Sequence, residues 1–235
     1  LLGLLPDTTY RVQVVAYGAG GLAAGDTLVI RTGPLPVDLP TYSAGGSSPS
    51  DGFVVFAAYP TPYGVIIDNT GRVVWYRRLD GGLTLNFQVQ PTGTYTTSPV
   101  QSDSTDLAPW VEFDALGAEL RQLGCTGGLK SRFHELLVEP DGSWWILCDE
   151  TRVMDLSPLG GHPAAQVTGT VVQHINQGGT ALFQWSAFDH FAITDLDSVS
   201  RVGPVVNWTH GNALAFDADG RLRGVFVGGG VRWQD

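Results

Sequence analysis

The stretch Val138-Glu139-Pro140-Asp141-Gly142-Ser143-Trp144-Trp145 decides the fold class of this chain. Apolar residues lie on either side of a polar turn that contains a glycine, which is the pattern of two short strands joined as a hairpin. Glycine suits such a turn because it adopts a positive φ at little steric cost. The pattern recurs along the chain, at residues 66–75, 89–95, 113–120, 138–145, 175–182 and 216–222.

The turn glycines pair off at roughly the 40–50 residue spacing of propeller blades, with some longer gaps. Two hairpins make one four-stranded blade, and blades stack radially to bury their faces. The chain contains 31 glycines and 14 prolines and has no sustained helical periodicity, so we predict an all-β fold. The strands amount to about three to four blades, and a closed ring needs at least about four. We therefore predict an incomplete β-propeller.

The N-terminal residues follow a different pattern. Tyr10, Val12 and Val14 alternate with polar residues and predict a half-buried strand, and a glycine-rich turn at 18–25 leads to a second strand at 27–32. These strands resemble the last two of a fibronectin type III domain, which is a β-sandwich. Two strands alone cannot bury a core, so the rest of that module is expected upstream. The predicted domains are the sandwich strands at 1–33, a Pro/Gly/Ser-rich linker at 34–51 and the partial propeller at 52–235.

Composition excludes some classes of partner. The formal net charge of −10 argues against nucleic acid, because phosphate neutralisation demands a basic face. The apolar runs are far too short to cross a bilayer. Cys125 and Cys148 fit either one disulfide or two buried thiols, and the sequence leaves both open. Neither end of the chain resembles a natural terminus, so we interpret it as a fragment whose signal segment is missing.

Two histidines occupy matching places in the repeat. His134 precedes the turn glycine Gly142 by eight residues, and His210 precedes Gly220 by ten. Each is therefore expected to begin the same type of strand in a different blade. Equivalent strand ends of a propeller face the central channel, so both imidazoles are expected to converge on one pocket.

At these residues the chain resembles the arylsulfotransferase family. The run Trp208-Thr209-His210-Gly211-Asn212 is similar to the family's H-x-N segment, and Phe133-His134-Glu135 is similar to its H-D segment. The stretch from Phe183 to His190 is similar to its Trp-plus-Asp-His segment. The resemblance covers about residues 40–227 and implies a propeller of six blades, of which this chain contains about three to four.

The resemblance implies a reaction. The family transfers a sulfuryl group from a phenyl sulfate ester to a phenol, without a nucleotide donor or other cofactor, through a transiently sulfated histidine. Cationic and N–H donors stabilise the charge that spreads over the sulfuryl oxygens. By carry-over, His134 and His210 bind those oxygens or protonate the leaving phenolate, and Asn212 orients His210 or lines the pocket. His190 joins them as a substrate-binding candidate, and no metal is expected.

The chain departs from the family pattern at three places. Glu135 replaces an aspartate, and Gly228 stands where the family's sulfate-clamping arginine is expected. Arg232 lies four residues further on and is the remaining candidate for that role. The nucleophilic histidine is expected beyond Asp235, so this fragment is expected not to turn over. The family and domain types also imply a secreted or periplasmic protein, whereas the oligomeric state stays open.

Other interpretations of the histidines compete with the transferase. Each of His134 and His210 is also typical of a buried imidazole bonded to a neighbouring blade. A second hypothesis is a non-catalytic secreted propeller that binds a glycan, a phenolic ligand or a protein, favoured by Gly228. A third is a hydrolase or lyase whose metal is held by His134, His210 and a further histidine.

Overall fold

The computed structural model describes residues 3–46, 50–79, 82–101, 109–195, 202–218, 220 and 222–227. Over these residues the fold is all-β, as predicted, with short 3-10 helices at Ser157–Leu159 (η1), Ala187–Asp189 (η2) and Ile193–Asp195 (η3). None of these described helices is long and apolar enough to span a membrane. Arg232 and Gly228 lie outside the described residues.

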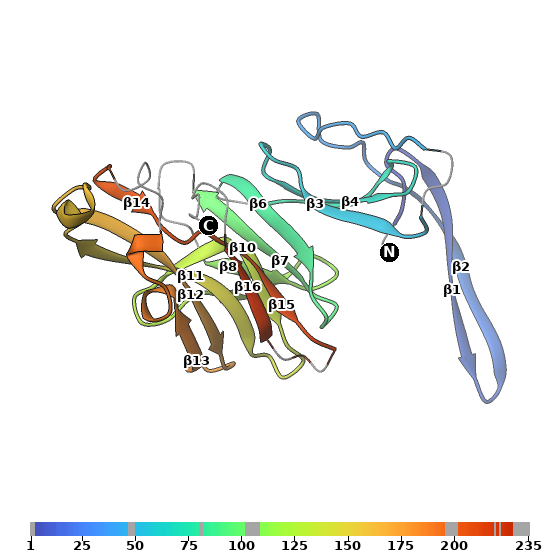
Figure 1. The fold of residues 1–235 in the computed structure, drawn as a ribbon. Helices are drawn as coiled ribbons and strands as arrows, with labels where there is room; N and C mark the ends of the chain where they lie inside the picture. The colour runs from blue at the N-terminus through green and yellow to red at the C-terminus, as the bar shows by residue number, and fades with distance from the viewer. Residues whose placement is uncertain are drawn as a thin grey trace.

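The N-terminal strands form a separate two-stranded sheet. β1 (Thr9–Gly18) pairs antiparallel with β2 (Gly21–Arg31), and the hairpin extends away from the other sheets (Figure 1). The predicted glycine-rich turn at 18–25 is wrong, because Gly18 pairs directly with Gly21 and both strands run to the tip. Glycine has the same backbone donor and acceptor as other residues, so the strand pairing continues through Gly18 and Gly21. The origin of this hairpin in a sandwich domain stays a prediction.

The remaining strands form successive antiparallel sheets. Within each of the first three, strands that follow one another in sequence are hydrogen-bonded neighbours, as in propeller blades. The first sheet contains β3 (Phe53–Ala57), β4 (Tyr63–Asp68) and β5 (Val73–Arg78). The second contains β6 (Gly82–Val89), β7 (Tyr95–Gln101), β8 (Trp110–Phe113) and β9 (Glu119–Leu123). The third contains β10 (Lys130–Val138), β11 (Trp144–Met154), β12 (Ala165–Ile175) and β13 (Ala181–Ser186), and β14 (Val205–Asn207) pairs parallel with β12. β15 (Gly211–Phe216) and β16 (Leu222–Val227) form the next hairpin.

The six predicted turns are confirmed as one type of hairpin loop. Their glycines all have φ between 74° and 85°. At Gly142 the amide donates to the carbonyl of Glu139, and Glu139 in turn donates to the carbonyl of Ser143. This is a type I turn closed by a glycine in the left-handed region. A side chain at that φ would be strained, which explains the glycine in every copy.

The first strands of successive sheets lie next to one another. β3 contacts β6, β6 contacts β10, and β10 contacts β15 (Figure 1). Side chains between sheets form the core: Trp110 and Leu123 of the second sheet pack with Leu136 and Ile146 of the third. This arrangement of meanders around their first strands confirms the incomplete propeller. It also places β10 and the start of β15 side by side.

A disulfide joins Cys125 to Cys148, which resolves the two alternatives that the sequence left open. It ties the loop after β9 to β11. Cys148 pairs in the β10–β11 ladder with Ser131, whose hydroxyl accepts a hydrogen bond from the Cys125 amide. The bridge therefore fixes the sheet edge at which the two candidate histidine strands meet.

Candidate functional site

His134 lies in an interruption of the β10–β11 ladder. Ser131 pairs with Cys148 and Leu136 pairs with Ile146, so residues 132–135 of β10 bulge opposite Leu147 alone. The expectation that His134 begins its strand is therefore wrong, because β10 starts four residues earlier at Lys130. A bulge redirects side chains out of the regular alternation, which makes it a frequent feature of sites.

Side chains of the second sheet bind the carbonyl groups that the bulge leaves free. Asn86 Nδ2 donates to the carbonyls of Phe133 at 3.0 Å and His134 at 2.9 Å. Trp110 Nε1 donates to the carbonyl of Arg132 at 2.7 Å. Unpaired buried carbonyls are costly, so these donors stabilise the bulge and with it the direction of His134.

His210 is held from the opposite side, directly before β15. Its neighbour Thr209 accepts a hydrogen bond on its hydroxyl from the Thr170 amide, at 2.7 Å. The Gly211 amide donates to the Thr170 hydroxyl at 2.8 Å. A Cβ at Gly211 would lie 2.5 Å from the Thr170 methyl, so only glycine permits this approach. The backbone on both sides of His210 is therefore anchored to β12.

The two imidazoles meet, as expected from their matching places in the repeat. His134 Nε2 and His210 Nε2 are 2.9 Å apart, and the rings lie edge to face. Around His210, Arg132 Nη2 lies 3.4 Å and Asn207 Nδ2 lies 2.6 Å from the Nδ1 atom. Arg132 also forms an ion pair with Asp149 of β11, with 2.8 Å between Nε and Oδ1.

Burial and neighbouring charge keep this pair of rings neutral. Burial, followed by the proximity of His210 and Arg132, lowers the pKa of His134 to about 4. Burial and then the Arg132 charge also lower the pKa of His210. Burial raises the pKa of the Asp149 carboxyl, although the Arg132 and Lys130 charges oppose that rise. At neutral pH the site thus contains two neutral imidazoles beside a guanidinium–carboxylate pair.

The other predicted site residues take different positions. Asn212 Nδ2 donates to the backbone carbonyl of His210 at 3.1 Å, so it contacts the main chain of that residue. His190 lies exposed after η2 and stacks on Trp185, with 5.1 Å between ring centroids. Among the described residues, no hydrogen bond joins His190 to the imidazole pair. Arg232 is not described.

Sequence reasoning missed Arg132, Asn207 and Asp149 at this site. Arg132 lies two residues before His134, which is the spacing of side chains on one strand face. That spacing is a signal that could have indicated it, although the bulge departs from the alternation of a regular strand. Asn207 and Asp149 come from other strands, and their places depend on pairing that the sequence does not show. In the described part of the chain, no three His, Cys, Asp or Glu side chains gather in a way that could hold a metal ion.

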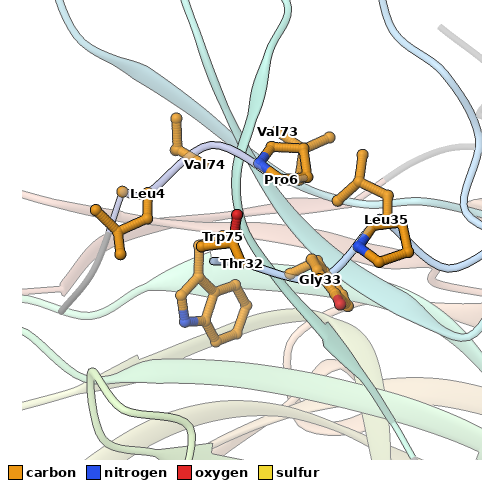
Figure 2. A pocket seen from close by; sticks show the side chains of 11 residues that line it. Leu4, Pro6, Thr32, Gly33, Leu35, Val73, Val74 and Trp75 are labelled. Atoms are coloured by element: carbon orange, nitrogen blue, oxygen red, sulfur yellow. The ribbon is translucent and has the colours of Figure 1, made fainter. Parts of the chain in front are cut away.

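A cleft elsewhere lacks comparable chemistry. It has a volume of about 380 Å³ and lies where the N-terminal segment meets β5. Figure 2 shows Leu4, Pro6 and Leu35 beside Val73 and Trp75. Its lining contains no imidazole, carboxylate or cation, so the histidine pair is the better candidate for the chemical centre.

The fold and the site together define a class of protein: an incomplete propeller with two paired imidazoles beside the first strands of its sheets. The arylsulfotransferase (ASST) family model matches residues 47–222, about three quarters of the chain and including both histidines. The chain therefore belongs to the arylsulfotransferase family. No match was found among curated proteins.

Proposed function

We propose that this chain carries part of the site for nucleotide-independent sulfuryl transfer from an aryl sulfate ester to a phenol. In the net reaction the S–O bond to the donor aryl group breaks and an S–O bond to the acceptor forms. The acceptor's phenolic proton is returned to the leaving phenolate. His134 and His210 bind the sulfuryl oxygens or move that proton. The observation that carries the proposal is their 2.9 Å contact within the family-matched region.

The chemistry of the site fits this reaction. The sulfuryl group carries negative charge on several oxygens, and N–H donors in a partly dry site stabilise that charge. Arg132 supplies a cation at 3.4 Å from His210, and its side chain is only 14% exposed. A neutral imidazole can also take up a proton and, once protonated, return it. Arg232 is retained as a proposed sulfate-binding residue, with His190 and Asn212 as proposed pocket residues.

The proposed location is secreted or periplasmic. The Cys125–Cys148 disulfide supports it, since such bridges persist in oxidising compartments and are rare in the cytosol. The proposed partners are small-molecule aryl sulfates and phenols.

The test is the release of nitrophenolate from 4-nitrophenyl sulfate with and without added phenol, in the absence of any nucleotide, by a longer protein that includes this chain and the expected nucleophilic histidine. We expect phenol-dependent release that His210→Ala abolishes. The control is His162→Ala, because His162 lies in the loop after η1, where its Nδ1 accepts from the Ala164 amide. Undiminished nitrophenolate release by His210→Ala would contradict the assignment of His210 to the site.

A second candidate is a non-catalytic propeller that binds a glycan, a phenolic ligand or a protein. The sequence feature that favours it is Gly228, at the place expected for the family's arginine. Titration calorimetry with 4-nitrophenyl sulfate distinguishes the two functions. Heat of binding without nitrophenolate release, from folded protein that includes the expected nucleophilic histidine, supports the binding module.

A further inference from the structure

The Nδ1 atom of His210 faces hydrogen-bond donors. Arg132 Nη2 lies 3.4 Å away and Asn207 Nδ2 lies 2.6 Å away. An amide group alone fits either way round, since its oxygen and nitrogen are interchangeable in shape. A guanidinium has only N–H groups and cannot accept a hydrogen bond. Nδ1 of His210 must therefore present its lone pair, and the Asn207 amide must turn its nitrogen towards it.

The proton positions of both rings follow. A neutral imidazole whose Nδ1 accepts has its proton on Nε2. His210 Nε2 faces His134 Nε2 at 2.9 Å, so His210 donates to His134. His134 then accepts on Nε2 and, when neutral, has its proton on Nδ1. The pair has a direction, from His210 to His134.

The group that sets this direction is itself held firmly. Arg132 is ion-paired to Asp149, and the two side chains are only 14% and 15% exposed. The carbonyl of Arg132 accepts from Trp110 Nε1 at 2.7 Å. Among the described residues, the charged and titratable groups that face His210 are Arg132 and His134 from β10, with Asp149 of β11 behind Arg132. Asn207 from β14 is uncharged.

We infer that Arg132 is a positioning residue that fixes His210 as the Nε2–H tautomer, with Asn207 as a second donor to Nδ1, and that the two histidines therefore have different roles. His210 is a hydrogen-bond donor that transfers no proton. Neutral imidazole keeps its single N–H proton at ordinary pH, and Nδ1, the atom that could take up another proton, faces the Arg132 cation. His134 Nε2 is the atom that takes up and returns a proton. This division rests on the proposed function for its catalytic meaning: when substrate replaces the contact between the rings, the Nε2–H of His210 donates to a sulfuryl oxygen, while the freed Nε2 of His134 accepts the phenol's proton and returns it to the leaving phenolate.

Asn207→Asp tests the tautomer directly. A carboxylate accepts where the amide donates, so the variant should draw a proton onto Nδ1 of His210 and raise its pKa. Asn207 is exposed, which makes the substitution compatible with folding. The matched control is Asn176→Asp, which adds the same charge in a hairpin turn. Asn176 Oδ1 accepts from the Thr180 amide there, and Asp114 makes the equivalent bond in another turn.

The measurement is long-range ¹H–¹⁵N correlation of the histidine rings in labelled protein, with the two rings assigned from His210→Gln and His134→Gln. We expect a bare Nδ1 and a protonated Nε2 for His210, the opposite pattern for His134, and a change to Nδ1–H in Asn207→Asp only. A protonated Nδ1 on His210 in the unmodified chain would overturn the inference, and no change in Asn207→Asp would overturn the role given to Asn207.

Kinetics with 4-nitrophenyl sulfate separates this inference from the proposed function. Asn207→Asp should lower kcat on the order of 100-fold, which is typical for the loss of one oxyanion donor, with a smaller change in KM. The pH profile should gain a second titrating group, because His210 now protonates. The expected ring spectra without any sulfuryl transfer by the longer protein that includes the expected nucleophilic histidine would uphold the tautomer and reject the proposed function. Transfer with a normal pH profile in Asn207→Asp would reject the division of roles.

Discussion

The β1–β2 hairpin and the β10–β12 sheet are both antiparallel and rich in alternating apolar residues, yet their environments differ. Tyr17 and Leu28 of the hairpin are 81% and 61% exposed, whereas Ile146 and Leu147 of β11 are fully buried. The ladder of β10 is interrupted over four residues, and side chains of a neighbouring sheet fill the gap. An irregular strand needs such neighbours, because its free backbone groups must find partners. The comparison shows why the site lies where sheets contact one another.

The largest expected difference between the two regions is in core stability. Leu136→Ala in β10 should lower the free energy of unfolding by about 2–5 kcal/mol, because a buried leucine leaves a cavity. Leu28→Ala in β2 should change it by less than about 0.5 kcal/mol. Leu136 is 1% exposed and Leu28 is 61% exposed. Urea denaturation followed by tryptophan fluorescence measures both, and equal losses would contradict the comparison.

Removing the disulfide should have the next largest effect. Cys125 and Cys148 are 23 residues apart, and a bridge over a loop of this length stabilises the fold by about 3 kcal/mol. Cys125→Ala with Cys148→Ala should lose about that amount and weaken the edge that supports Arg132. The unmodified chain measured with and without reductant provides a second reading. Unchanged stability in both experiments would show that packing alone holds this edge.

Two glycines give a smaller contrast. A Cβ at Gly211 would meet the Thr170 side chain at 2.5 Å, whereas one at Gly25 in β2 would lie 3.7 Å from the Val14 carbonyl. Gly211→Ala should therefore cost about 1–3 kcal/mol through overpacking and displace His210. Gly25→Ala should leave thermal stability nearly unchanged. A crystal structure of Gly211→Ala with the histidine pair still in contact would contradict the displacement.

The last expected effect is the pH dependence of stability. Burial first, and then His210 and Arg132, lower the pKa of His134 from 6.5 to about 4. The unfolded chain therefore binds a proton at a higher pH than the folded chain does, and stability falls as pH falls from about 6.5 to about 4. His134→Gln should flatten part of this dependence in thermal denaturation at fixed ionic strength. An unchanged slope would show that His134 is not the group responsible.

The local features of the fold followed from the sequence alone. Each hairpin depends on a glycine with positive φ, as at Gly142, and on apolar residues within a few positions of it. Short-range geometry of this kind depends on consecutive residues, so the strands, their meanders and the all-β class could be predicted from the sequence. The turn between β1 and β2 was misplaced because glycines within an exposed strand have the same composition as a loop.

The site was only half determined by the sequence. The matched places of His134 and His210 in the repeat indicated that the imidazoles would meet, although the residues are 76 positions apart. The bulge, the donors from Asn86 and Asn207, and the ion pair of Arg132 were decided by the tertiary structure. The physical reason is that their partners come from strands whose side-by-side position results from packing between sheets. The type of a residue and its neighbours in the chain do not determine which donor faces it across a contact between sheets.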